Sequence, residues 1–245
     1  MPEPPKESSG TTVPAVDRRS QVQGGQPRVP PLSRDLLAAI SRAGPVATRR
    51  PTVVLAGVVI MSVAWAGALL RYAMRLRWDL SWWPLPLLAL YLAISLTAVA
   101  GHLTFALVPT PGKILPSAHE SARASVVLML ITVPLGIFFG ANAPVARPPV
   151  SSALAFWPEA LACVANGLAV AVLPVVLGLA ALRRVVPGGA WRTALAVGAG
   201  SGVLAGAVLQ LHCPNALFTH VALAHGAAMI LPAFVLVAIQ RRPRR

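Results

Sequence analysis

The sequence predicts an all-α membrane protein with six transmembrane helices. Of its 245 residues, 56% are hydrophobic and only 11% are charged, whereas soluble domains carry about 25% charged residues. A helix needs about 20 mainly apolar residues to cross a hydrocarbon core of about 30 Å, and six segments are close to that length. They are Thr52–Met74, Trp82–Val108, Ser125–Ala141, Ala160–Leu182, Thr193–Leu211 and Leu217–Ile239.

The basic residues divide unequally between the two sides of these segments. The side of the N-terminus carries 17 Lys and Arg, and the opposite side carries four, namely Arg71, Arg75, Arg77 and Arg147. Because basic residues accumulate on the cytoplasmic side, we expect both termini in the cytoplasm and the chain in a bacterial inner membrane. This topology and anionic lipid headgroups explain the net charge of +14. No base-reading motif accompanies it, so we expect no direct nucleic-acid partner.

The region before the first span is predicted to have two parts. Residues 1–32 hold seven prolines and few large apolar residues, a composition typical of a disordered tail. From Ser33 on, a helix N-cap and an apolar face at helical spacing predict a short helix that ends at Gly44-Pro45. Its key residues are Asp35, Leu36, Leu37, Ile40 and Pro45. So short a helix is marginal alone in water, so it either rests on lipid headgroups or docks a protein partner.

The predicted organisation therefore has four parts along the chain. They are the tail 1–32, a cytoplasmic docking helix and linker 33–51, the transmembrane domain 52–240 and a basic tail 241–245. In the fifth span, Gly198, Gly202 and Gly206 recur every four residues, a pattern that allows close helix packing in lipid. Prolines lie inside the third, fourth and sixth spans, where each removes a backbone donor and should kink its helix. They are Pro134, Pro174 and Pro232.

Two cysteines are predicted to lie at the same depth near the outer face. Cys163 is early in the fourth span and Cys213 follows the end of the fifth. The extracytoplasmic side is oxidising and permits a disulfide, whereas reduced thiolates bind soft metal ions. With His212 and His220 nearby, these cysteines form a candidate ligand set. Alternatively, Cys163 fills a small apolar space and His212 caps a helix end.

The remaining polar residues give weaker signals. We expect His102, inside the second span, to make a packing hydrogen bond rather than relay protons. His220 and His225 are five residues apart, about 140° around an α-helix, so the spacing predicts no common ligand face. None of the seven acidic residues lies in a predicted span, and no motif of a hydrolase, metalloprotease or nucleotide-binding enzyme is present. The sequence therefore predicts no enzyme.

An ordered set of short elements resembles one known family. The elements are Asp35-Leu36-Leu37 with Ile40 and Pro45-Val46, Arg77-Trp78-Asp79-Leu80, Val108-Pro109 with Pro111-Gly112-Lys113, Cys163, Ala181-Leu182-Arg183-Arg184, the three glycines of the fifth span, and Leu211-His212-Cys213-Pro214. In this order they resemble the NrsF-type membrane anti-sigma factors, which are negative regulators of extracytoplasmic-function sigma factors of the sigma F kind. The chain departs from the pattern at Asn215 and Ala216, where acidic residues are usual, and at Ala224, where a Trp is expected.

The resemblance implies a partner and a signalling role. The chain would hold a sigma factor inactive at the membrane through Asp35, Leu36, Leu37, Ile40 and Pro45, and an outside signal at the cysteine pair would release it. Two other functions stay open on the residues alone. A small transporter would need polar residues along a path through the spans, and a metal or redox enzyme would be built on the cysteines and histidines. The polar residues available for a path are His102, Asn166, Gln210 and His225.

Overall fold

The computed structural model describes residues 50–108, 118–143, 153–185 and 191–241, and within these ranges every regular element is helical. Six helical segments are long and apolar enough to cross a membrane, which confirms the predicted fold class. The elements are α2 (Pro51–Leu69), η2 (Leu70–Met74), η3 (Trp78–Trp82), α3 (Leu85–Leu107), α4 (Ala118–Ala141), α5 (Ala153–Val185), α6 (Trp191–His212), α7 (Phe218–His220), η4 (Val221–His225) and α8 (Gly226–Arg241).

Two helices extend beyond the apolar segments that predicted them. The third span, expected to begin at Ser125, is part of a helix that begins at Ala118. The fourth, expected to begin at Ala160, begins at Ala153 and includes Glu159. The expectation that no acidic residue lies inside a spanning helix is therefore wrong. A hydropathy window ends where polar residues begin, whereas a helix continues as long as its backbone hydrogen bonds do.

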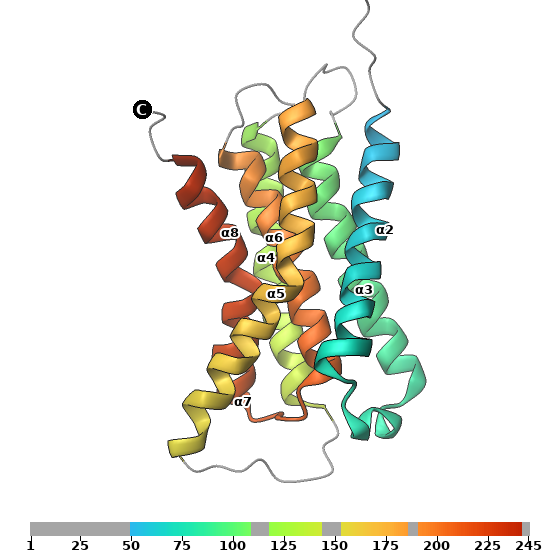
Figure 1. The fold of residues 1–245 in the computed structure, drawn as a ribbon, viewed down its shortest axis with the longest axis vertical. Coiled ribbons are helices and arrows are strands. Elements are labelled where there is room, and N and C mark those ends of the chain that lie inside the picture. The colour runs from blue at the N-terminus through green and yellow to red at the C-terminus, as the bar shows by residue number, and fades with distance from the viewer. Residues whose placement is uncertain (1–49, 109–117, 144–152, 186–190, 242–245) are drawn as a thin grey trace, which may run out of the picture. The chain divides into compact units, whose positions relative to one another are not determined.

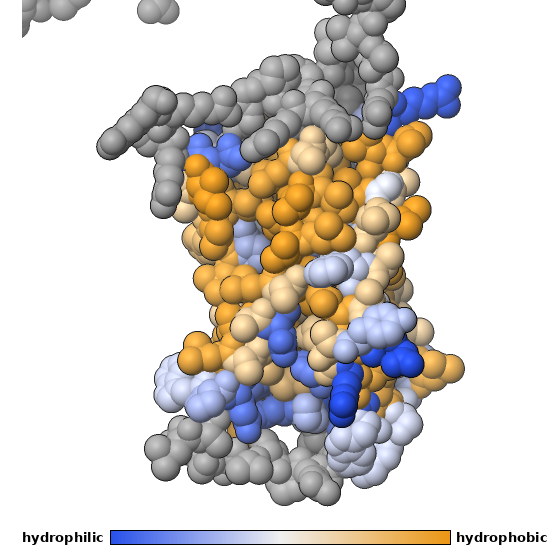
Figure 2. All heavy atoms as spheres, viewed as in Figure 1, coloured by the Kyte–Doolittle hydropathy of each residue, from blue (hydrophilic) through white to orange (hydrophobic). Residues whose placement is uncertain are grey.

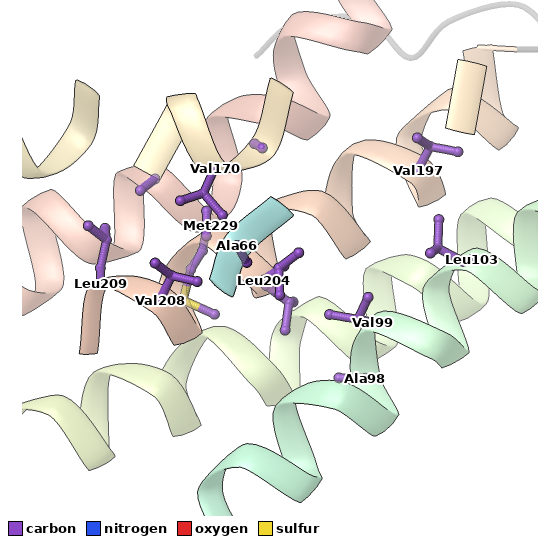
Figure 3. Close-up of a cluster of buried hydrophobic side chains, with 14 of the residues drawn as sticks. Ala66, Ala98, Val99, Leu103, Val170, Val197, Leu204, Val208, Leu209 and Met229 are labelled. Atoms are coloured by element: carbon purple, nitrogen blue, oxygen red, sulfur yellow. The ribbon is translucent and has the colours of Figure 1, made fainter. Parts of the chain in front are cut away.

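Helix α6 is the axis around which the other helices pack. In its spanning window 89% of the residues are buried, against 17% in α2. The predicted glycine stripe lets α8 approach, since a Cβ on Gly198 would lie 2.5 Å from the Cα of Ala233, and a Cβ on Gly202 would overlap the carbonyl oxygen of Met229. Figure 3 shows Leu204 and Val208 within the resulting cluster of buried side chains. The stripe is therefore a packing feature, as predicted.

The two ends of the helical unit differ. The start of α2 and the end of α8 lie at one end, and α7 lies at the other (Figure 1). Helix α5, which contains Pro174, changes direction along its length (Figure 1). Hydrophobic residues cover most of the face seen in Figure 2, and hydrophilic residues gather toward the end that carries α7. The functional residues described next lie at that end.

Candidate functional site

Two thiols and two imidazoles converge from three segments of the chain. Cys163 comes from α5, Cys213 follows α6, and His220 and His225 come from α7 and η4. All four side chains are buried, and one potential ligand atom of each lies within 4.8 Å of the others. The Sγ atom of Cys213 is 3.4 Å from the Sγ atom of Cys163 and 3.4 Å from Nε2 of His220. We call these four residues the Cys–His cluster.

A tight turn after α6 brings Cys213 to this position. The amide of Cys213 still donates to the carbonyl of Leu209 at 2.8 Å, and Pro214 then ends the helix because it has no amide hydrogen to donate. The side chain of Asn215 accepts a hydrogen bond from the Leu217 amide at 3.1 Å and donates to Oε2 of Glu159 at 3.2 Å. These bonds hold the turn against α5, one helical turn before Cys163.

The pairing of His220 with His225 contradicts the spacing argument made from the sequence. That argument assumed α-helical geometry, but Val221–His225 is a π-helical turn. Its hydrogen bonds join residues five apart, and this brings His220 and His225 to the same side of the segment. Their ring centroids are 5.5 Å apart. The expectation that these two histidines share no common face was therefore wrong, and such π-turns are often found at functional sites.

His212 lies outside the cluster and has another role. Its Nδ1 is 2.8 Å from the carbonyl oxygen of Arg75, and because a carbonyl only accepts, Nδ1 carries the hydrogen. In the neutral ring Nε2 then accepts from Nδ2 of Asn166, at 3.3 Å. Both ring nitrogens are thus engaged away from the sulfur atoms. Of the four residues predicted as a ligand set, the structure brings Cys163, Cys213 and His220 together, with His225 as the fourth member.

The two cysteines are free thiols. Their sulfur separation of 3.4 Å exceeds the bond length of about 2.05 Å in a disulfide. The Cys163 thiol donates a hydrogen bond to Cys213, and this lowers the pKa of the Cys213 thiol below its ordinary value. The neighbouring imidazoles of His220 and His225 act in the same direction, and burial opposes them. Cys213 is therefore the sulfur that more readily carries a negative charge, the form that binds metal or attacks an oxidant.

The donor set suits a soft metal ion. Among the described residues, Nδ1 of His220 and both ring nitrogens of His225 are buried without a hydrogen-bond partner, an arrangement that normally costs free energy. Thiolate and imidazole are the ligands preferred by zinc and related ions. A tetrahedron with metal–sulfur bonds of about 2.3 Å has sulfur atoms about 3.8 Å apart, close to the observed 3.4 Å. A bound ion would bond to one of the two unpaired nitrogens of His225.

Other predicted residues stand apart from the cluster. His102 lies in α3, is fully buried, and has no hydrogen-bond partner at either nitrogen among the described residues, so the predicted packing bond is absent there. The residues predicted to contact a partner protein lie outside the described residues. They are Asp35, Leu36, Leu37, Ile40 and Pro45.

Comparison with known proteins identifies the family. No curated protein and no solved structure matches the chain. A family model described as the negative regulator of sigma F, NrsF, matches residues 37–244, which include all six spanning helices and the Cys–His cluster. A regulator of this kind acts on a sigma factor, and its family name describes no catalysis. The chain belongs to the NrsF family of negative regulators of sigma F.

Proposed function

We propose that the chain is an inner-membrane anti-sigma factor that holds an extracytoplasmic-function sigma factor through residues 33–46 and releases it when a signal reaches the Cys–His cluster from outside. The family match to a negative regulator of sigma F carries the first half of this proposal. The sensing half goes further and depends on the geometry of the Cys–His cluster.

The charge distribution supports a cytoplasmic position for the segment that contacts the partner. The side of the N-terminus carries 17 basic residues and the other side four, and basic residues favour the cytoplasmic side. The start of α2 and the end of α8 lie at one end of the helical unit, and α7 of the Cys–His cluster lies at the opposite end (Figure 1). In this orientation the Cys–His cluster faces the extracytoplasmic side.

A soft metal ion is the signal that the cluster chemistry favours. The unpaired nitrogens of His225 support this choice, because an ion would bond to one of them, whereas a disulfide between Cys163 and Cys213 would leave both without a partner. Ion binding would draw the turn after α6, the segment α7–η4 and the outer part of α5 together. The ion can change binding of the sigma factor only if it binds more tightly to the state of the protein that releases the sigma factor than to the state that holds it.

Deletion of residues 33–46 tests whether this segment binds the sigma factor. The variant should still insert in the membrane, because all six spanning helices remain, but should no longer co-purify with the sigma factor. A deletion of equal length within residues 1–32 is the matched control and should retain the sigma factor. If the sigma factor co-purifies with both variants alike, the proposed docking segment is wrong.

Substitution of His225, with His212 as the matched control, tests the metal site of the sensor. Residues that merely orient a metal ligand already contribute about 10–100-fold to affinity, so His225→Ala should weaken Cd²⁺ binding by at least that much. His212→Ala should bind Cd²⁺ like the unsubstituted protein, because both His212 nitrogens are engaged elsewhere.

Cys163→Ser and Cys213→Ser should lose induction without a change in membrane abundance. Normal induction in both cysteine variants would return the cysteines to a packing role.

A further inference from the structure

The segment that follows the first spanning helix is hydrogen-bonded to the end of α6. The amide of Arg77 donates to the carbonyl of Leu211 at 3.0 Å, and Nδ1 of His212 donates to the carbonyl of Arg75 at 2.8 Å. The guanidinium of Arg77 also reaches the carbonyl of Gln210, at 3.5 Å. The last carbonyl groups of a helix have no hydrogen-bond donor within the helix. Here Arg77, from a distant part of the chain, donates to two of these carbonyls of α6.

A buried ion pair fixes the Arg77 side chain in this position. Its guanidinium forms two hydrogen bonds with the carboxylate of Asp79, of 2.6 and 2.7 Å, and it lies over the Trp83 ring. Arg77 is 5% exposed and Asp79 is fully buried. Buried ion pairs add little net stability, because desolvation offsets their attraction, but they can specify one arrangement of the parts that they join. Arg77, Asp79 and His212 together form what we call the latch.

The latch lies between the Cys–His cluster and the least buried spanning helix. His212 directly precedes Cys213 of the Cys–His cluster, and Arg75 directly follows the π-turn that ends the first span. Only 17% of the spanning window of α2 is buried, so few contacts oppose its movement. At its other end, α2 begins at Pro51, and four residues separate it from the segment proposed to hold the sigma factor.

The backbone at Arg75 is held in a conformation that residues with a side chain rarely adopt. Arg75 has a φ of 65° and a ψ of 144°, which lies outside the regions that non-glycine residues normally populate. The hydrogen bond from His212 holds the Arg75 carbonyl in that conformation. When this bond breaks, the residue can relax to a negative φ, which would change the direction in which the chain leaves α2.

We propose that Arg77, Asp79 and His212 are positioning residues that transmit the state of the Cys–His cluster to α2, and through α2 to the segment that holds the sigma factor. This inference rests on the proposed function. Movement of the Cys213 turn shifts the end of α6, and the latch passes this shift to the outer end of α2. A helix is stiff along its axis, so its inner end moves with its outer end.

Two variants that weaken the latch test this proposal in the full-length protein. His212→Ala removes one hydrogen bond, and the double variant Arg77→Gln/Asp79→Asn replaces both charges, so that no charge is left buried alone. The matched control is Arg71→Gln, which removes a positive charge from an exposed residue of the preceding π-turn η2. Two quantities are measured: Cd²⁺ affinity of the purified protein, and the ratio of sigma-dependent reporter activity with and without Cd²⁺ in cells.

Both latch variants should bind Cd²⁺ at least as tightly as the unsubstituted protein, because coupling between two sites is reciprocal, and their induction ratio should fall to that of Cys163→Ser. The Arg71→Gln control should respond like the unsubstituted protein. An unchanged induction ratio in the latch variants overturns the proposal, and so does a parallel loss of Cd²⁺ affinity, because the latch would then only build the metal site. If the double variant fails to accumulate, His212→Ala decides. Failure of the proposed function is distinguishable, since the unsubstituted protein itself would then not respond to Cd²⁺.

Discussion

Gly202→Ala should push α6 and α8 apart and lower the stability of the protein. The added Cβ would overlap the carbonyl oxygen of Met229 on α8. That oxygen belongs to a helix backbone, so no side-chain rotation can make room, and one helix must move away from the other. Overpacking of this kind costs about 1–3 kcal/mol. For a domain of this size, about 2–4 °C of Tm corresponds to each kcal/mol, so the expected decrease in Tm is about 2–12 °C.

Gly57→Ala is the matched control, because it makes the same chemical change where there is space. No atom lies within 4 Å of a Cβ at Gly57, and the residue is exposed on α2. Alanine in a helix is favoured over glycine by about 0.5–1 kcal/mol, so this variant should keep its Tm or raise it by a few degrees. The opposite signs of the two shifts distinguish helix packing from helix propensity.

The assay is thermal unfolding of both variants in one detergent at one scan rate, which matters because unfolding of membrane proteins is often irreversible. Cd²⁺ affinity should also fall in Gly202→Ala, because Cys213 follows α6 while His225 directly precedes α8. If both variants shift Tm by the same amount and in the same direction, the close approach of α6 to α8 is not what Gly202 provides.

Three further predictions concern the cluster, the core and the topology. Cys163→Ala removes the hydrogen bond that lowers the pKa of Cys213, so thiolate absorbance of Cys213 should develop at higher pH than in the unsubstituted protein; an unchanged titration would mean that Cys163 has no such effect. Gly140→Ala places a Cβ against the side-chain amide of Gln210, so it should lower Tm. Adding Gln210→Ala to this variant should restore part of the lost Tm. If the effects of the two substitutions on Tm are strictly additive, the two residues are not in contact. Reporters fused after Arg241 should be active in the cytoplasm, and reporters in the loop between α4 and α5 should be active outside; the reverse pattern would invert the proposed topology.

The sequence alone was enough for the architecture, because membrane insertion depends on local composition. The length of each apolar segment predicted six spanning helices, and the spacing of Gly198, Gly202 and Gly206 predicted close packing against another helix. The ordered motifs predicted the family, which the match over residues 37–244 confirms. The depth of Cys163 and Cys213, estimated from the position of each in its span, predicted that the two thiols could meet.

Only the tertiary structure decided which histidine joins the cysteines and what His212 does instead. A π-helical turn at Val221–His225 shifts the helical phase by one residue and turns His225 toward the sulfur atoms, and no spacing rule for an α-helix anticipates that shift. The latch depends on contacts between Arg77 and the end of α6, more than 130 residues away along the chain. The composition of a segment decides whether that segment forms a spanning helix. The hydrogen-bond partner of a buried polar atom depends instead on which helices pack together and on how each helix is rotated about its own axis.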